Sequence, residues 1–148
     1  IAGMAAAIEE GTENLRTNAQ RITTLRDRLI ENTLKIPGAY LTGDPINRLP
    51  GHASFVFEGI EQSAYIINML NGEGICASSG SACSASSTEA PHVLGAMGYD
   101  DEISRSALRL SLSCYNTEEE IDAINNKLPL IIAELRGRKA ERYFHAVP

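Results

Sequence analysis

The chain has 148 residues, of which 43% are hydrophobic and 22% charged, a composition typical of one globular domain. Its net charge of −6 and pI near 5.0 argue against a protein that binds the phosphate backbone of nucleic acids. Its apolar runs are too short to cross a bilayer, and no basic segment precedes the apolar start, so we expect neither a membrane protein nor a signal peptide.

The first predicted element is a long helix over residues 4–34. Gly11 weakens its middle, which predicts a break near residues 10–12, and Pro37-Gly38 ends it. Its apolar stripe has helical spacing and consists of Leu15, Ile22, Leu25 and Leu29.

The middle of the chain predicts two strands, a helix and a third strand. The strands cover residues 40–43 and 52–58, and in the second of them Phe55 and Phe57 share the face opposite Val56. A helix over residues 62–70 follows, and residues 75–77 (ICA) predict a short apolar strand.

The segment 78–87 reads SSGSACSASS and has no charged or bulky side chain. After it, Ser87 or Thr88 can cap a helix that runs through Met97 and ends before Gly98.

The last two elements are a strand and a long helix. Over residues 106–113, leucines alternate with Arg109 and serines, which predicts a half-buried strand. Thr117 and Glu120 form a capping box for a helix with apolar residues at 121, 124, 128, 131 and 135. Residues 137–148 lack a stripe and are interpreted as a tail. The fold class is therefore α/β (α+β): a small sheet of about three to four strands flanked by helices, with a long N-terminal helix.

Cys83 is the first candidate for chemistry. Small neighbours leave its thiol reachable, and the positive end of the following helix would favour a thiolate. The alternative is a spectator cysteine in a surface loop. The three cysteines, Cys76, Cys83 and Cys114, include no C-x-x-C pair, which argues against a disulfide framework or a metal site and favours a reducing, cytoplasmic setting.

Arg109 is the second candidate, because a guanidinium held on a strand suits bidentate binding of a carboxylate. The alternative is a solvated charge on an edge strand. His92 could exchange protons near neutral pH, but such a histidine more often caps or packs. His52 is expected to be structural and Cys76 to be a small buried hydrophobe.

The segments 75–98 (ICASSGSACSASSTEAPHVLGAMG) and 107–122 (ALRLSLSCYNTEEEID) resemble the C-terminal part of the NifS/IscS-type cysteine desulfurases, class-V aminotransferase-like enzymes. Residues 53–75 are similar to the stretch that precedes the family's catalytic loop, and residues 1–10 look like the helix that joins its large and small domains. The resemblance extends over roughly residues 1–137.

The resemblance implies a function. These enzymes use pyridoxal phosphate to take sulfur from L-cysteine, leaving L-alanine and a persulfide on an enzyme cysteine. By position, Cys83 would accept the sulfur and Arg109 would bind the substrate carboxylate. The mobile loop would include Ser79, Gly80, Ser81, Ala82 and Ser84, and we expect residues 79–87 to be poorly ordered.

The sequence also departs from the family pattern. The proline after the loop, Pro91, is moved by one position, and Cys114 replaces a usual basic residue. The family's cofactor lysine lies in an S-x-H-K segment of the large domain, and no such context surrounds Lys35, Lys127 or Lys139. We therefore expect no pyridoxal phosphate on this piece and no desulfurase activity from it alone.

The expected organisation is a remnant of the interdomain helix (residues 1–20), a small domain (21–137) with the cysteine loop 78–87, and a tail (138–148). Expected partners are L-cysteine and an iron–sulfur scaffold or other sulfur acceptor. The parent is expected to be a homodimer and the piece a monomer. Two alternatives stay open, a non-catalytic interaction module and a stand-alone persulfide carrier.

Overall fold

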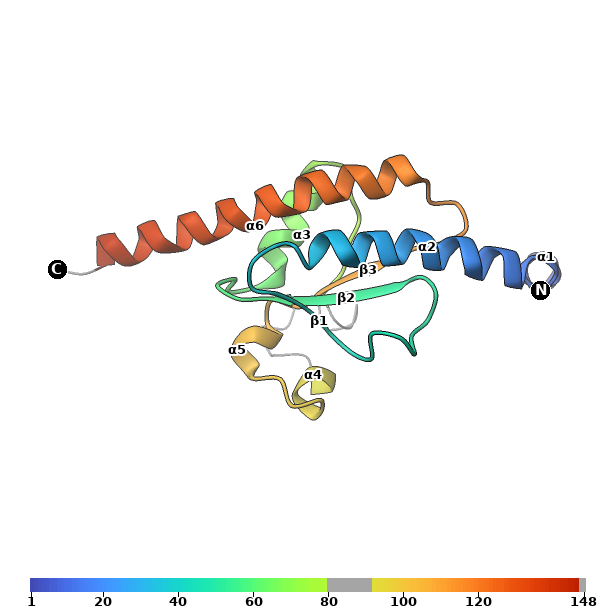
Figure 1. Ribbon diagram of the computed structural model, residues 1–148, viewed down its shortest axis with the longest axis horizontal. Coiled ribbons are helices and arrows are strands. Elements are labelled where there is room, and N and C mark those ends of the chain that lie inside the picture. The colour runs from blue at the N-terminus through green and yellow to red at the C-terminus, as the bar shows by residue number, and fades with distance from the viewer. Residues whose placement is uncertain (80–91, 147–148) are drawn as a thin grey trace.

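The computed structural model describes residues 1–79 and 92–146, and side chains as far as Arg138 (Figure 1). In chain order the elements are α1 (Ala2–Glu13), α2 (Leu15–Thr33), β1 (Ala39–Leu41), β2 (His52–Phe57), α3 (Ser63–Gly72), α4 (His92–Ala96), α5 (Asp101–Ser104), β3 (Leu108–Ser111) and α6 (Glu118–Ala146).

The three strands form one antiparallel sheet in the order β1-β2-β3, so the predicted fold class is confirmed. In the register of β2 and β3, His52 pairs with Ser111 and Ser54 pairs with Arg109. Residues paired in this way point to the same face of an antiparallel sheet.

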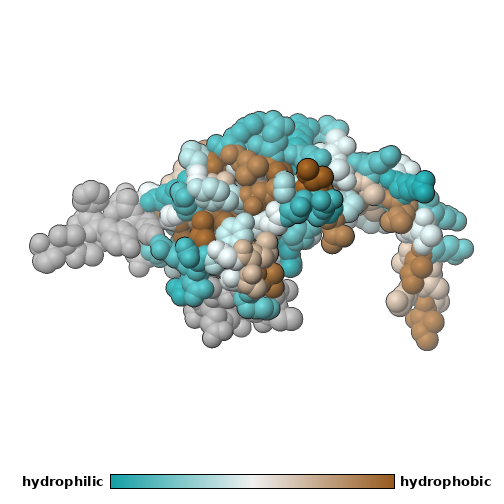
Figure 2. Space-filling model, turned by 60° about the horizontal axis from the view of Figure 1, so that its bottom comes forward, coloured by the Kyte–Doolittle hydropathy of each residue, from teal (hydrophilic) through white to brown (hydrophobic). Residues whose placement is uncertain are grey.

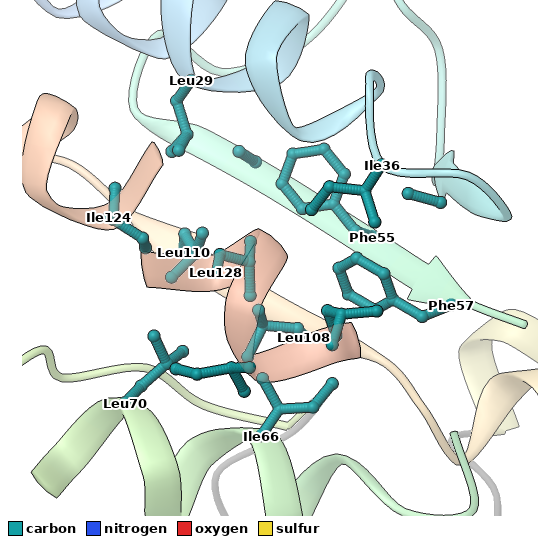
Figure 3. Close-up of a cluster of buried hydrophobic side chains, with 14 of the residues drawn as sticks. Leu29, Ile36, Phe55, Phe57, Ile66, Leu70, Leu108, Leu110, Ile124 and Leu128 are labelled. Atoms are coloured by element: carbon teal, nitrogen blue, oxygen red, sulfur yellow. The ribbon is translucent and has the colours of Figure 1, made fainter. Parts of the chain in front are cut away.

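The main core lies between one face of this sheet and the helices α2, α3 and α6 (Figure 1, Figure 3). Phe55 and Phe57 on β2 are fully buried there, as is Leu108 on β3. The helices contribute the apolar positions that their periodicity predicts, among them Leu25, Leu29, Ile66, Leu70, Ile121, Ile124, Leu128 and Ile131.

Among the described residues, α4 and α5 cover one part of the opposite face of the sheet. Val56, Leu94 and Ala107 form a second small core with Tyr99 and Ile103, beneath α4 and α5. The predicted split of Phe55 and Phe57 from Val56 is thereby confirmed. Toward the start of β2 the same face carries His52, Ser54, Arg109 and Ser111 in place of apolar residues.

Three expectations about the elements need correction. The N-terminal helix breaks at Asn14, between α1 and α2, slightly later than predicted, and Leu15 of the predicted stripe is exposed. Residues 75–77 do not form a strand, and only an isolated bridge joins Ser78 to Arg109. The short helix α5 was not predicted from the sequence.

Two other predicted segments also differ from the observed structure. Of the helix expected through Met97, the described part is α4, which ends at Ala96. Its expected cap, Ser87 or Thr88, lies outside the described residues. At the C-terminus the tail has a helical backbone as far as Ala146, continuous with α6.

Candidate functional site

Arg109 lies in the middle of β3, on the partly covered face of the sheet. Its neighbours in the sheet are two serines, Ser54 across from it on β2 and Ser78 on its other side. Its side chain is half-buried. The guanidinium therefore leaves the apolar core, as the alternation of the strand predicts.

Three hydrogen bonds join Arg109 to Ser78. The backbone N–H of Arg109 donates to the carbonyl of Ser78 at 2.7 Å, and the N–H of Ser78 donates back at 3.1 Å. The Arg109 Nη2 donates to Ser78 Oγ at 2.9 Å. Ser78 is the residue at which the serine-rich segment starts, so the arginine is tied to the base of the segment that carries Cys83.

The loop between β1 and β2 is organised by Arg48. Its guanidinium donates to the carbonyl oxygens of Asp44 (2.8 Å), Thr42 (2.8 Å) and His52 (3.3 Å). The carboxylate of Asp44 accepts the N–H groups of Asn47 and Ile46, and these bonds lower the pKa of Asp44. The loop thus holds a fixed positive charge at the start of β2.

His52 lies close enough to Arg48 and Arg109 for both of their charges to act on its imidazole. Partial burial lowers the pKa of its imidazole, and the charges of Arg48 and Arg109 lower that pKa further. The imidazole is therefore neutral at pH 7. From the sequence we predicted only a structural role for His52. The period of two along the strand, which places residues 52 and 54 on the face opposite Phe55, could have indicated that His52 shares a face with Arg109.

The remaining predicted site residues fall into two groups. Cys83, Gly80, Ser81, Ala82 and Ser84 lie outside the described residues, as does nearly all of the segment expected to be poorly ordered. Ser79 is described and half-buried, and His92 is exposed at the start of α4.

The structure describes two of the three cysteines, Cys76 and Cys114. Cys76 is exposed, which corrects the expectation of a small buried hydrophobe, because its stretch does not join the sheet. Cys114 is half-buried after β3, and its carbonyl accepts a hydrogen bond from Arg21 Nη1 at 2.6 Å.

The lysines with described side chains do not fit a cofactor site on this face. Lys35 Nζ pairs with Glu31 at 3.2 Å, and Lys127 Nζ pairs with Glu73 at 2.7 Å. Both ion pairs belong to the helical layer on the other side of the sheet. Over the described part of the chain, no helix has the length and apolarity to cross a membrane, and no group of metal-ligating side chains forms a metal site.

Comparison with known families decides the relationship. The family model for class-V aminotransferases matches residues 1–124. The chain belongs to the class-V aminotransferase family. Within this class-V chain, the matched residues include the whole sheet, Arg109 and the segment with Cys83.

Curated relatives of this class-V chain are cysteine desulfurases. It is 43% identical over 137 residues to the cysteine desulfurase IscS of Methanosarcina thermophila, which covers 93% of this chain and 34% of that protein. It is 42% identical over 138 residues to the cysteine desulfurase NifS of Azotobacter vinelandii, with the same two coverages. The chain therefore spans about a third of the length of these relatives.

Solved structures give the same relationship for the fold. A NifS-like protein matches with a TM-score of 0.77 at 34% identity, over 90% of this chain and 33% of that one. A NifS-like protein from Rickettsia africae matches with a TM-score of 0.72 at 28% identity, over 87% and 32% of the two chains. The predicted NifS/IscS resemblance is confirmed.

Proposed function

We propose that this chain is the C-terminal small domain of a cysteine desulfurase that takes sulfur from L-cysteine and leaves L-alanine. The observation that carries the proposal is the triple hydrogen bonding of Arg109 to Ser78. These bonds tie Arg109, which we propose binds the substrate carboxylate, to Ser78, where the serine-rich segment that contains Cys83 begins in the sequence. The names of the relatives support the same reaction.

Arg109 would hold the carboxylate of the amino-acid substrate. A guanidinium offers two parallel N–H donors to a carboxylate, and its strand restricts the position of its backbone. Cys83 follows Ser78 by five positions, so an extended chain keeps it within roughly 18 Å of Ser78. That length is sufficient for a thiolate to approach an amino acid bound at Arg109 and then to move away.

Cys83 would then receive the sulfur. Its thiolate attacks the Sγ of the bound cysteine, a new S–S bond forms, and the bond between Cβ and Sγ breaks. The electron pair of the broken bond stays with the substrate carbon, which takes up a proton to become the methyl group of alanine. The product on the protein is a persulfide, ready for transfer to an acceptor thiol.

Pyridoxal phosphate is assigned to the rest of the parent protein. Lys35 and Lys127 are engaged in surface ion pairs, and neither lies on the face of Arg109. We therefore expect this chain alone to release no sulfur from L-cysteine.

Helix α1 fits a role as part of the connection to that remaining portion. It has no buried residue, and its apolar side chains Met4 and Ile8 are 71% and 58% exposed. The arm projects from the body of the molecule at the right of Figure 2. An exposed apolar helix of this kind favours contact with another surface, here the portion of the parent that precedes residue 1.

The proposal also covers the sulfur acceptor, the oligomeric state and the location of the parent. The persulfide would be delivered to an iron–sulfur scaffold or another sulfur-acceptor protein. The parent would be a homodimer of the cytoplasm, and this chain by itself a monomer.

The test uses the full-length parent protein with Cys83→Ser. We expect the rate of alanine and sulfide formation from L-cysteine to fall about 100-fold or more, because the nucleophile is lost, while the absorbance of bound cofactor stays unchanged. Mass spectrometry of the wild type after one turnover should place the extra sulfur on Cys83.

The matched control is Cys76→Ser, which removes an exposed thiol from the stretch just before the same segment. It should leave the rate within about twofold. Undiminished turnover in Cys83→Ser would refute the proposal. Sulfur appearing on Cys83 only when another protein supplies it would instead establish a persulfide carrier.

A further inference from the structure

Four polar residues share the half of the sheet face that lies opposite the main core. The register pairs His52 with Ser111 and Ser54 with Arg109, so all four side chains point away from the main core. His52 and Arg109 are diagonal neighbours across β2 and β3, at a spacing of about 7–8 Å between Cα atoms. Side chains as long as histidine and arginine can meet the same small ligand at that spacing.

The positive groups around this surface are held in place. Arg48 is fixed by its three backbone carbonyl partners, and Arg109 by its bond to Ser78 Oγ. Among the described residues, the charged groups that act on His52 are Arg48 from the loop and Arg109 from β3. No carboxylate acts on His52 in the part of the chain that the structure describes.

We propose that His52 is a second recognition residue for the carboxylate that Arg109 binds, and that it takes up a proton from solvent when the carboxylate arrives. The inference rests on the proposed function and deepens it. It names a residue, besides the arginine, that determines affinity for the anionic end of the substrate.

The physical reason is charge compensation. In the free protein, burial opposes a positive charge on the imidazole, and the charges of Arg48 and Arg109 oppose it further. A carboxylate beside Arg109 offsets that repulsion, so the imidazolium becomes more stable. Linkage is reciprocal: if anion binding favours protonation, then protonation favours anion binding.

The lowered pKa of His52 gives the direction in which carboxylate affinity depends on pH. The pKa of His52 lies below its ordinary value of 6.5 in the free protein. As the pH falls toward that pKa, the affinity for a carboxylate should rise by about 3- to 30-fold, the range for one added charge near the ligand in a partly solvated site.

The experiment is an NMR titration of the 148-residue chain with acetate, whose dispersed amide spectrum first establishes that it is folded. The His52 ring signals are followed against pH with and without acetate, at constant ionic strength. We expect acetate to raise the pKa of His52 and to bind more tightly as the pH falls toward that pKa, compared over a pH range in which acetate itself stays ionised.

Three variants give the comparison. His52→Gln should still bind acetate but lose the pH dependence, and Arg109→Gln should lose most of the binding. Lys35→Gln removes a positive charge from the helical layer, outside the surface, and should behave as the wild type.

Each outcome decides one point. Acetate affinity that is independent of pH, or equally dependent on pH in His52→Gln, overturns the role of His52 and leaves the proposed function standing. Absence of acetate binding in the wild type overturns both the role of His52 and that of Arg109 in carboxylate binding.

Discussion

At the scale of single residues, Gly51 shows how closely the loop that holds Arg48 packs against the end of β3. A Cβ at this position would lie 2.2 Å from the carbonyl oxygen of Leu112, an atom of the backbone that cannot move aside alone. The two residues are joined by the Leu112 N–H, which donates to the Gly51 carbonyl at 2.8 Å. Gly51 thus fastens the loop of Arg48 to the end of β3.

Gly51→Ala is expected to lower the free energy of unfolding by about 1–3 kcal/mol, because the added methyl group forces the loop and the strand apart. Urea denaturation followed by circular dichroism measures the change. Gly72→Ala is the control, since an added Cβ there meets nothing within 4 Å. A variant at position 51 as stable as the wild type would show that the close approach is not maintained.

At the scale of elements, the start of α6 depends on a reciprocal cap. Thr117 Oγ1 accepts the N–H of Glu120 at 3.3 Å, and Glu120 Oε2 accepts the N–H of Thr117 at 3.1 Å. The same carboxylate accepts a hydrogen bond from Asn116 Nδ2 at 2.8 Å. The bond from the Asn116 side chain, and then that from the Thr117 backbone, lower the pKa of Glu120.

This cap predicts a defined dependence of stability on pH. A lowered pKa in the folded state means that Glu120 stabilises the fold above its ordinary value of 4.5, and that this contribution is lost as the pH falls through the lower folded value. Glu120→Gln should therefore reduce stability at neutral pH and lose less of it on acidification than the wild type does. Thermal melts at neutral pH and well below pH 4.5 measure the difference.

Thr117→Ala separates the cap from the charge. It removes one acceptor for an orphan N–H but keeps the carboxyl group, and it should cost about 1 kcal/mol at either pH. Equal acid sensitivity of the wild type and Glu120→Gln would rule out the carboxylate as the source of the effect.

At the scale of the whole molecule, the body is held together by the core between the sheet and the helices α2, α3 and α6, whereas α1 takes no part in it. The contrast separates the segment that stabilises this domain from the segment proposed to contact the rest of the parent. Burial of apolar area is the dominant favourable contribution to folding, so an arm without buried residues contributes little.

Deletion of residues 1–13 should accordingly change the free energy of unfolding of the 148-residue chain by less than about 0.5 kcal/mol. Chemical denaturation of the truncated and complete chains tests this. In the full-length parent, substitution of Met4 and Ile8 by serine should lower the free energy of unfolding, because these side chains are proposed to contact the rest of that protein. A large loss of stability in the truncated chain would place α1 in this domain instead.

Prediction from the sequence succeeded where a local pattern carries the information. The alternation around Phe55 and Leu108, and the helical spacing of Leu25 and Ile124, depend only on which residues must be buried. It failed for residues 75–77, because a short apolar run does not reveal whether a neighbouring strand is available to pair with it. It also missed α5, a single turn without a stripe.

By itself, the sequence determined the main helices and strands, the face each one buries and, through residues 75–98 and 107–122, the family. Only the tertiary structure decided that His52 lies beside Arg109 and that Ser78 is bonded to it. The reason is that alternation along one strand gives only the face on which a residue lies, whereas the residue opposite it depends on how strands far apart in the chain pack together.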